Sequence, residues 1–369
     1  MKIDTDLTSH ERVSRCLEFR TPDRAPREHW ILPWVRQFVP EQLETLVGQF
    51  PSDFIYVDPL ATGDRSKGET YRKGDNTDAW GNVWSAGEDG VAGEVKRPAL
   101  ADWAAFSNYQ PPWEVIRRGQ WDTAQRACEE NRKTTKKFMR CRTTIQPFQQ
   151  LQFLRGSENT YLDLGEESPE FFRLLAMVHE FSLEELSRWT KLDCDCVTFY
   201  DDWGSQRGLL ISPAQWRRIF KPLYLDYFQM VHQAGKKVFF HSDGCIIDLY
   251  DDLIEIGVDA INSQLFCMDI EEVARRFKGR ITFWGEIDRQ RILPFGTEAD
   301  VYRAVARVRR ALDDGCGGVV AQCSWEVRIP PENIAAVYAA WEMPLAELLD
   351  RVDRLPLPPA APVQHCAPG

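Results

Sequence analysis

The sequence contains no uninterrupted apolar stretch of about 20 residues, the length that a helix needs to cross a bilayer. Residues 1–6 also lack the basic and apolar pattern of a secretory signal peptide. Acidic residues outnumber basic ones, so the formal net charge is -11, and no long basic run occurs. We therefore expect a cytoplasmic protein whose partners include neither nucleic acid nor a membrane.

The sequence also lacks the compact framework of a disulfide-rich domain. Its 10 cysteines are scattered over 369 residues, a distribution typical of reduced thiols, several of them in the core. Cys194 and Cys196 stand at the start of a predicted strand, and we interpret them as structural. Hydrophobic residues make up 43% of the chain, including 13 Trp and 20 Phe, so a large core is available. This length is compatible with two ordinary domains or one large barrel.

Apolar runs typical of strands alternate along the chain with amphipathic segments typical of helices. The strand candidates are residues 29–32, 54–57, 138–143, 196–200, 238–244, 259–262, 281–285 and 318–322, and each is followed by a helical segment. Strict alternation predicts parallel strands with right-handed crossovers, and eight such units predict an α/β fold, the (β/α)8 TIM barrel.

We expect a single barrel domain over residues 1–354. Short alternating pieces rich in Gly, Asp and Trp predict a small antiparallel insertion after the second strand, at about residues 63–98. Prolines and alanines at residues 355–369 predict a flexible C-terminal tail.

In a barrel of this kind the loops that follow the strands build the active site, so the last polar residues of each strand meet at one mouth. Here they are Arg142, Asp202, His241, Asp243, Asn262, Gln264, Glu286, Asp288, Gln322 and Cys323. Imidazole, carboxylate and thiol groups that converge in this way suit a metal or proton-transfer site. The alternative is that each is a strand-end residue whose hydrogen bonds go to loop backbone.

Side chains alternate across a strand, so His241 and Asp243 should leave the same face of the fifth strand. With the thiolate of Cys323 from the eighth strand, they form a predicted zinc site that keeps one position open for substrate. An open zinc lowers the pKa of a bound thiol, which indicates alkyl transfer to or from sulfur.

Two carboxylates are the candidate catalytic residues, Glu286 and Asp202. Beside a metal, Glu286 is expected to act as a fourth ligand or as the base that accepts a proton from a bound thiol or water. The candidate substrate-binding residues are Arg142, Trp203, Arg207, Asn262, Gln264 and Trp284.

Four tryptophans predict an aromatic lining at the substrate end of the cavity: Trp80 and Trp84 from the insertion, and Trp203 and Trp284 from the barrel. Such a lining suits a flat or methylated ligand better than a polyacid. The alternative is that these residues pack the insertion onto the barrel.

Several short motifs together resemble those of the uroporphyrinogen decarboxylase superfamily. They are residues 11–13, 23–26, 202–213, 241–244, 284–288 and 331–334, and the resemblance extends over about residues 9–345. It implies a (β/α)8 barrel. One branch of the superfamily decarboxylates uroporphyrinogen III without a cofactor. The other branch holds zinc in a His-x-Cys…Cys set and moves methyl groups between a corrinoid and a thiol or similar acceptor.

The motifs are closer to the methyltransferase branch. The glycine-arginine part of the decarboxylase motif is missing after Arg36. His241 and Cys323 fall where the histidine and second cysteine of the methyltransferases stand, and Asp243 takes the place of the first cysteine. The resemblance therefore implies zinc, a corrinoid carried by a partner protein, and a small-molecule substrate. Two alternatives are a cofactor-independent decarboxylase of uroporphyrinogen or another acid, and a non-catalytic binding barrel.

Overall fold

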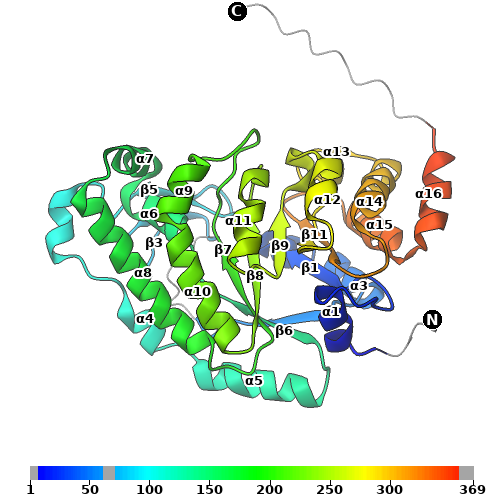
Figure 1. The fold of residues 1–369 in the computed structure, drawn as a ribbon, viewed down its shortest axis with the longest axis horizontal. Coiled ribbons are helices and arrows are strands. Elements are labelled where there is room, and N and C mark those ends of the chain that lie inside the picture. The colour runs from blue at the N-terminus through cyan, green and yellow to red at the C-terminus, as the bar shows by residue number, and fades with distance from the viewer. Residues whose placement is uncertain (1–6, 61–70, 357–369) are drawn as a thin grey trace, which may run out of the picture.

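The computed structural model describes residues 7–60 and 71–356. Eight parallel strands form a nearly closed barrel surrounded by helices, which confirms the predicted TIM-barrel fold (Figure 1). The barrel strands are β1 (Arg27–Ile31), β2 (Phe54–Val57), β6 (Phe138–Arg142), β7 (Cys196–Tyr200), β8 (Lys237–Ser242), β9 (Ala260–Ser263), β10 (Thr282–Trp284) and β11 (Val319–Trp325). Their order around the sheet is β1-β11-β10-β9-β8-β7-β6-β2, so chain order is kept except that β1 closes against β11.

Helices cover the outside of the barrel, and a short helix closes its N-terminal end. The helices are α1 (Ser9–Leu17), α2 (Pro33–Phe38), α3 (Pro40–Gln49), α4 (Trp113–Arg117), α5 (Trp121–Lys133), α6 (Pro147–Arg155), α7 (Ser157–Glu166), α8 (Pro169–Trp189), α9 (Pro213–Ile219), α10 (Lys221–Gln233), α11 (Tyr250–Glu255), α12 (Ile270–Phe277), α13 (Ile292–Phe295), α14 (Glu298–Leu312), α15 (Pro331–Glu342) and α16 (Leu345–Asp353). Single 3-10 turns are η1 (Trp103–Asn108), η2 (Ile247–Leu249) and η3 (Leu265–Cys267).

The insertion after β2 is the predicted antiparallel sheet. It consists of β3 (Gly74–Thr77), β4 (Val83–Ala86) and β5 (Glu94–Arg97), paired in the order β3-β4-β5. The start of the insertion at residues 63–70 and the tail residues 357–369 lie outside the described residues.

Two strands extend beyond their predicted limits by two residues or more, because polar side chains interrupt the apolar pattern. β1 begins at Arg27 instead of residue 29, since buried Glu28 points into the barrel and pairs with Arg140, with Oε1 and Nη2 2.5 Å apart. β11 continues to Trp325 instead of residue 322, because polar Gln322 and Ser324 are buried along it.

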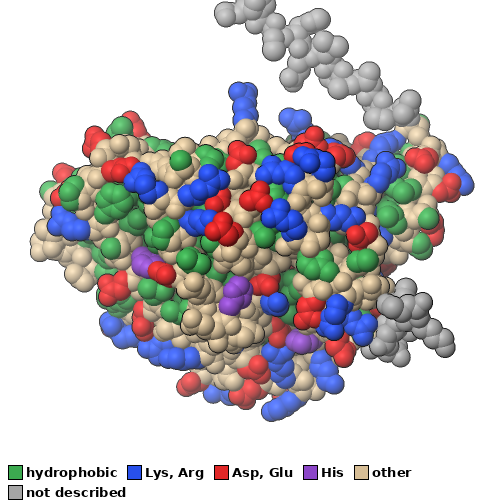
Figure 2. Space-filling view, viewed as in Figure 1, with side chains coloured by type: hydrophobic (Ala, Val, Ile, Leu, Met, Phe, Trp, Pro, Cys, Tyr) green, Lys and Arg blue, Asp and Glu red, His purple; other side chains and the backbone are tan. Residues whose placement is uncertain are grey.

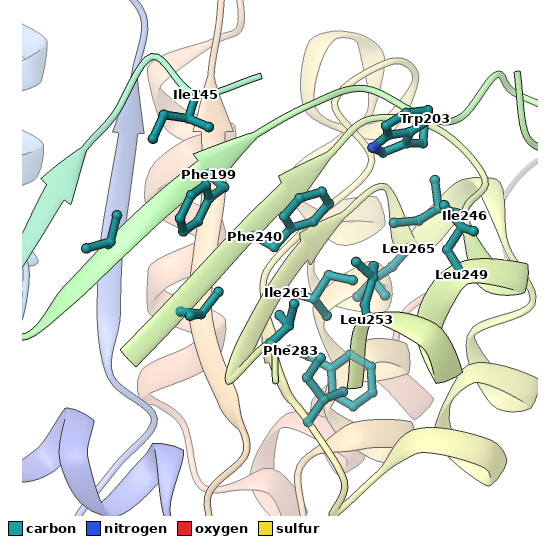
Figure 3. Close-up of a cluster of buried hydrophobic side chains, with 14 of the residues drawn as sticks. Ile145, Phe199, Trp203, Phe240, Ile246, Leu249, Leu253, Ile261, Leu265 and Phe283 are labelled. Carbon is teal, nitrogen blue, oxygen red and sulfur yellow. The ribbon is translucent and has the colours of Figure 1, made fainter. Parts of the chain in front are cut away.

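The apolar side chains form two layers separated by the sheet. Outside the barrel, Phe199, Phe240, Ile261 and Phe283 lie on successive strands and pack toward the helices (Figure 3). Inside, a smaller cluster fills the N-terminal end of the barrel, with Val13, Cys16 and Leu17 of α1 packed against Phe54, Phe138, Phe239, Ala260, Trp284 and Val320. The neighbours Phe239 and Phe240 therefore belong to different layers, as the alternation of a strand requires.

One ion-pair cluster joins β1 and β2, which share no strand ladder in the described part of the barrel. The backbone N–H of Asp53 donates to the carbonyl of Arg27 at 2.8 Å, and the Asp53 carboxylate accepts from the backbone N–H of Arg27 at 2.8 Å. The same carboxylate accepts from the guanidinium groups of Arg12 and Arg24, each at 2.7 Å. The Asp53 carboxylate thus links α1, β1 and β2 through one ion-pair cluster.

In the described residues, no helix is long and apolar enough to span a bilayer. On the face shown in Figure 2, Lys and Arg side chains are interspersed with Asp and Glu.

We predict that Asp53→Asn lowers the free energy of unfolding by about 3–5 kcal/mol at neutral pH, because buried Arg12 and half-buried Arg24 lose a shared counter-charge. Burial alone would raise the pKa of Asp53, but Arg24, the N–H of Arg27 and Arg12 hold it below its ordinary value. A carboxyl with a lowered pKa stabilises the fold above its ordinary pKa of about 4 and loses this contribution as the pH falls further.

The comparison is urea unfolding of wild type and variant at neutral pH and at about pH 3. The difference between them should shrink at the lower pH. Asp75→Asn, on exposed β3, is the control and should change little at either pH. Equal stability of Asp53→Asn and wild type at neutral pH would show that Asp53 does not stabilise the contact between β1 and β2.

Candidate active site

The polar residues inside the barrel stand at matching positions of neighbouring strands. His241 on β8 pairs in register with Tyr200 on β7 and with Asn262 on β9. Asp202 follows β7, and Asp243 follows β8, so both carboxylates lie at the C-terminal mouth near the His241 ring. The side chains of Asp202 and Asp243 are 31% and 33% exposed, which leaves this group accessible from the mouth.

Asn262 determines how His241 presents its ring. The side-chain nitrogen of Asn262 donates to the carbonyl of Trp284 at 2.5 Å and to Oε1 of Gln322 at 3.2 Å. Its oxygen, 2.6 Å from Nδ1 of His241, therefore accepts the Nδ1 hydrogen. This fixes the tautomer of the neutral ring, and the lone pair of Nε2 faces the two aspartates.

The three side chains fit a small metal ion. Nε2 of His241 lies 3.5 Å from Oδ1 of Asp202 and 3.5 Å from Oδ1 of Asp243. A direct charge-assisted hydrogen bond would be about 2.8 Å long. Two ligands of one tetrahedral zinc, each about 2.0–2.1 Å from the metal, are about 3.4 Å apart. One nitrogen and two carboxylate oxygens, all within 4.8 Å of one another, are therefore a compatible donor set.

Hydrogen bonds hold both carboxylates in place. Asp202 accepts from the backbone N–H of Asp243 at 2.9 Å and from Nε2 of Gln149 at 2.7 Å. Oδ1 of Asp243 lies 2.5 Å from Nη2 of Arg289. Burial would raise the pKa of Asp243, but His241 and Arg289 hold it below the ordinary value, so this carboxylate is ionised.

The adjacent residue Asp201 has a different role from Asp202. It is fully buried and accepts from the backbone N–H groups of Phe148 and Gln149 at 2.9 and 2.8 Å, at the start of α6. Asp201 therefore anchors α6, and the same helix brings Gln149 to Asp202.

Glu286 lies beside this group in a protonated state. It is only 4% exposed, and Oε1 is 4.0 Å from Nη1 of Arg289. Burial raises the pKa of Glu286 to about 8, with Asp243 and Glu326 adding to the effect and Arg289 opposing it. At neutral pH Glu286 is thus mainly a proton donor, whereas the sequence pattern suggested a base or a metal ligand.

Arg289 links the carboxylates of the mouth, and sequence reasoning missed it. Besides Asp243, it pairs with Glu326 at 2.9 Å, a residue that directly follows β11. The available signal was the position of Arg289, three residues after Glu286 in the loop that follows β10. Glu326 could have been selected only if β11 had been predicted to end at Trp325 instead of residue 322.

The prediction that Cys323 completes the metal site must be corrected. Cys323 faces outward from β11, and its sulfur contacts the hydroxyl of Tyr338 on α15 at 3.6 Å. Burial raises the pKa of its thiol to about 12, so it remains protonated. Its neighbour Gln322 faces the barrel interior instead and accepts from Asn262.

The predicted aromatic lining must also be corrected. Trp203 is fully buried and stacks on Phe148 with ring centroids 4.3 Å apart. Trp80 and Trp84 pack the insertion onto helices, against Phe181 of α8 and Phe153 of α6, respectively. All three tryptophans are buried and therefore do not line a cavity at the substrate end.

Two aromatic residues that sequence reasoning did not select lie next to His241. The ring of Trp30 on β1 is 4.9 Å from the His241 ring and 5.7 Å from buried Trp284. Tyr200 lies 5.9 Å from Trp30, and the guanidinium of Arg142 lies 6.0 Å from the Tyr200 ring. Trp30 and Tyr200 are both partly exposed, so they provide an aromatic wall at the site.

The remaining predicted residues lie at the rim or in turns. Arg207 and Gln264 line a cavity of about 300 Å³ together with Phe266, Cys267 and Arg289. Gln264 accepts from the backbone N–H of Gly244 at 3.1 Å and so supports the turn after β8. Asp288 accepts from the N–H groups of Gln290 and Arg291, each at 2.9 Å, which makes it a turn residue.

An eight-stranded parallel barrel with polar and ionisable residues at its C-terminal mouth is the architecture of an α/β-barrel enzyme. The family model described as uroporphyrinogen decarboxylase (URO-D) matches residues 88–343, more than half of the chain. The protein therefore belongs to the uroporphyrinogen decarboxylase family, as the motifs indicated. A comparison with curated proteins finds no match.

Among solved structures, a methyltransferase from Methanosarcina mazei shares the fold with a TM-score of 0.66 and 15% identity. The similarity covers 91% of this chain and 99% of the methyltransferase. An endo-beta-1,4-xylanase from Gloeophyllum trabeum has 9% identity and a TM-score of 0.42, over 90% of this chain and 99% of that chain. At this TM-score the similarity to the xylanase says nothing about the function of this protein.

We predict that Trp203→Ala costs about 3–5 kcal/mol of unfolding free energy, because it leaves a large cavity beside Phe148. Trp30→Ala should cost less, since the Trp30 ring is partly exposed. Denaturant unfolding compares the two variants. A well-folded Trp203→Ala protein with near wild-type stability would contradict a core role and indicate that Trp203 faces a ligand.

Proposed function

We propose that this protein is a metal-dependent enzyme that transfers a methyl group between a methylated small molecule or corrinoid and an acceptor. The observation that carries the proposal is the arrangement of Asp202, His241 and Asp243, with Nε2 of His241 turned toward both carboxylates by Asn262. The structural similarity to a protein described as a methyltransferase supports it.

Zinc is the proposed ion, with His241, Asp202 and Asp243 as its ligands. When bound, such a metal acts as a Lewis acid and lowers the pKa of a bound thiol or water. This donor set is harder than the thiolate set of the methyltransferase branch, because Asp243 replaces one cysteine and Asp202 takes the role expected of Cys323. The carboxylates also keep the ligand set independent of thiol oxidation.

Glu286 is proposed to supply a proton to the atom that loses the methyl group. A methylated oxygen or nitrogen that departs from its methyl carbon keeps the bonding electron pair and then needs a proton. Neutral Glu286, with a pKa of about 8, can donate this proton at neutral pH, and the nearby Arg289 guanidinium stabilises the carboxylate that remains.

The aromatic wall of Trp30 and Tyr200 is proposed to hold the methylated substrate. Flat apolar groups pack favourably on such rings. Arg142, beside Tyr200, would bind an acceptor or anionic group at the edge of the same substrate. The corrinoid is proposed to be carried by a partner protein, as the resemblance to the methyltransferase branch implies.

Decarboxylation is the second candidate, and the description of the matching family model favours it. In that reaction Arg142 would hold a substrate carboxylate, and Glu286 would protonate the carbon that loses carbon dioxide. The two candidates separate by substrate: uroporphyrinogen turnover without metal supports decarboxylation, whereas metal-dependent methyl transfer supports the main proposal.

We predict that the purified protein binds about one zinc per chain and that His241→Ala abolishes this binding. Asn262→Leu should weaken zinc binding by about 10–100-fold, because the imidazole loses the partner that fixes its tautomer. Metal analysis after dialysis against a graded chelator series measures both effects.

Cys323→Ala is the matched control, because it removes a thiol that the resemblance places at the metal and the structure places against Tyr338. It should retain zinc with wild-type affinity. Loss of zinc from Cys323→Ala, or its retention by His241→Ala, would refute the ligand assignment.

We predict that Glu286→Gln lowers methyl transfer by about 100-fold or more while leaving stability nearly unchanged, because glutamine resembles the neutral acid but has no acidic proton. Wild-type kcat/KM should fall as the pH rises through about 8, since the donor is lost on ionisation. The assay follows methyl transfer from methylated small molecules to reduced cobalamin.

Glu326→Gln is the comparison for this experiment, because Glu326 pairs with the same Arg289 but is 28% exposed. It should reduce activity much less than Glu286→Gln. Full activity of Glu286→Gln, or an unchanged pH profile, would reduce Glu286 to a structural residue.

A further inference from the structure

Two buried cysteines of the outer core lie against each other. Cys141 is on β6, and Cys194 is in the segment between α8 and β7. Their sulfur atoms are 2.8 Å apart, although both are free thiols. Atoms in ordinary non-bonded contact lie about 3.5–4.0 Å apart. A disulfide requires about 2.0 Å, so only a small movement separates this pair from a bond.

Hydrogen bonds hold the backbone near both cysteines, at Asp195 beside Cys194 and at Met139 two residues before Cys141. The N–H of Asp195 donates to the carbonyl of Met139 at 2.9 Å, and the N–H of Met139 donates to the Asp195 carboxylate at 2.6 Å. The Asp195 carboxylate is also 2.6 Å from the guanidinium of Arg132 on α5. These contacts tie the segment that carries Cys194 to β6, so the two thiols are held together in the folded state.

The two thiols differ in their access to solvent. Cys141 is fully buried, whereas Cys194 is 4% exposed and lies nearer the surface. Burial raises the pKa of the Cys141 thiol well above its ordinary value, so Cys141 does not react on its own at neutral pH. Cys194 is therefore the thiol that we expect a small oxidant to reach first.

We propose that Cys141 and Cys194 are a redox-sensitive pair that forms an intramolecular disulfide with hydrogen peroxide as oxidant. The sulfur of Cys194 attacks one peroxide oxygen, the O–O bond breaks, and Cys194 becomes a sulfenic acid with release of one water. The sulfur of Cys141 then displaces the hydroxyl group from Cys194, and its proton leaves with that hydroxyl as a second water. Two thiols lose two electrons in total, and one peroxide gains them. A dithiol reductant reverses the reaction.

The disulfide would close a loop that contains α6, α7 and α8, because its two residues are 53 positions apart in the chain. Closing a loop of this size restricts the unfolded chain, so the oxidised protein should unfold at a higher temperature. The proposal does not depend on the proposed methyl transfer.

The test treats the intact wild-type protein with hydrogen peroxide and maps its disulfides by mass spectrometry without reduction. We expect one main crosslink, between Cys141 and Cys194, the loss of two of the 10 thiols, and a higher Tm that dithiothreitol restores to the starting value. Cys141→Ser and Cys194→Ser should each lose the crosslink and the Tm shift.

Cys128→Ser is the matched control, because Cys128 is a third buried thiol close by on α5, and this variant should still form the crosslink. The wild-type map decides the matter even if a variant fails to fold. A Cys194 that stops at a sulfinic acid, a bond to Cys128 or Cys196, or no oxidation before unfolding would overturn the proposal.

Discussion

The alternation of side chains along eight parallel strands of fixed register is the constraint on which this structure depends. A parallel ladder sets which residues of neighbouring strands stand side by side, and the pleat then sends each side chain inward or outward. Phe239 and His241 face the barrel interior, while Phe240 between them packs under the helices. The same rule places Gln322 in the polar interior and Cys323 in the outer core.

The fold could be predicted from the sequence because its signals are repeated. Each strand has its own apolar run, and each is followed by a helix, so an error of two residues in β1 or three in β11 does not change the topology. The antiparallel insertion was equally predictable from its Gly, Asp and Trp pattern.

The site could be predicted only where a residue and its direction were both evident. His241 and Asp243 belong to one strand end, so their common direction followed from spacing alone. Cys323 was wrong because Gln322 and Cys323 are neighbours on β11 and must face opposite sides, and the sequence alone does not say which of the two faces the barrel interior. Arg289 was missed because its role arises from partners after two other strands.

The arrangement of charged side chains distinguishes this barrel from the methyltransferase branch that its motifs resemble. Where the methyltransferase branch holds zinc with sulfur, this chain presents two carboxylates around one imidazole, balanced by Arg289. Burial raises the pKa of Glu286 to about 8, and the neighbouring carboxylates of Asp243 and Glu326 add to the effect. The proposed metal ligands and the proposed proton donor thus occupy adjacent positions.

The central claim is that a metal in this barrel is held by nitrogen and oxygen and by no sulfur. X-ray absorption at the zinc edge of the zinc-loaded protein measures this directly. The account predicts a first shell made only of nitrogen and oxygen at about 2.0–2.1 Å. A sulfur neighbour at about 2.3 Å would contradict it, because it would require a cysteine such as Cys323 or Cys245 to turn into the site.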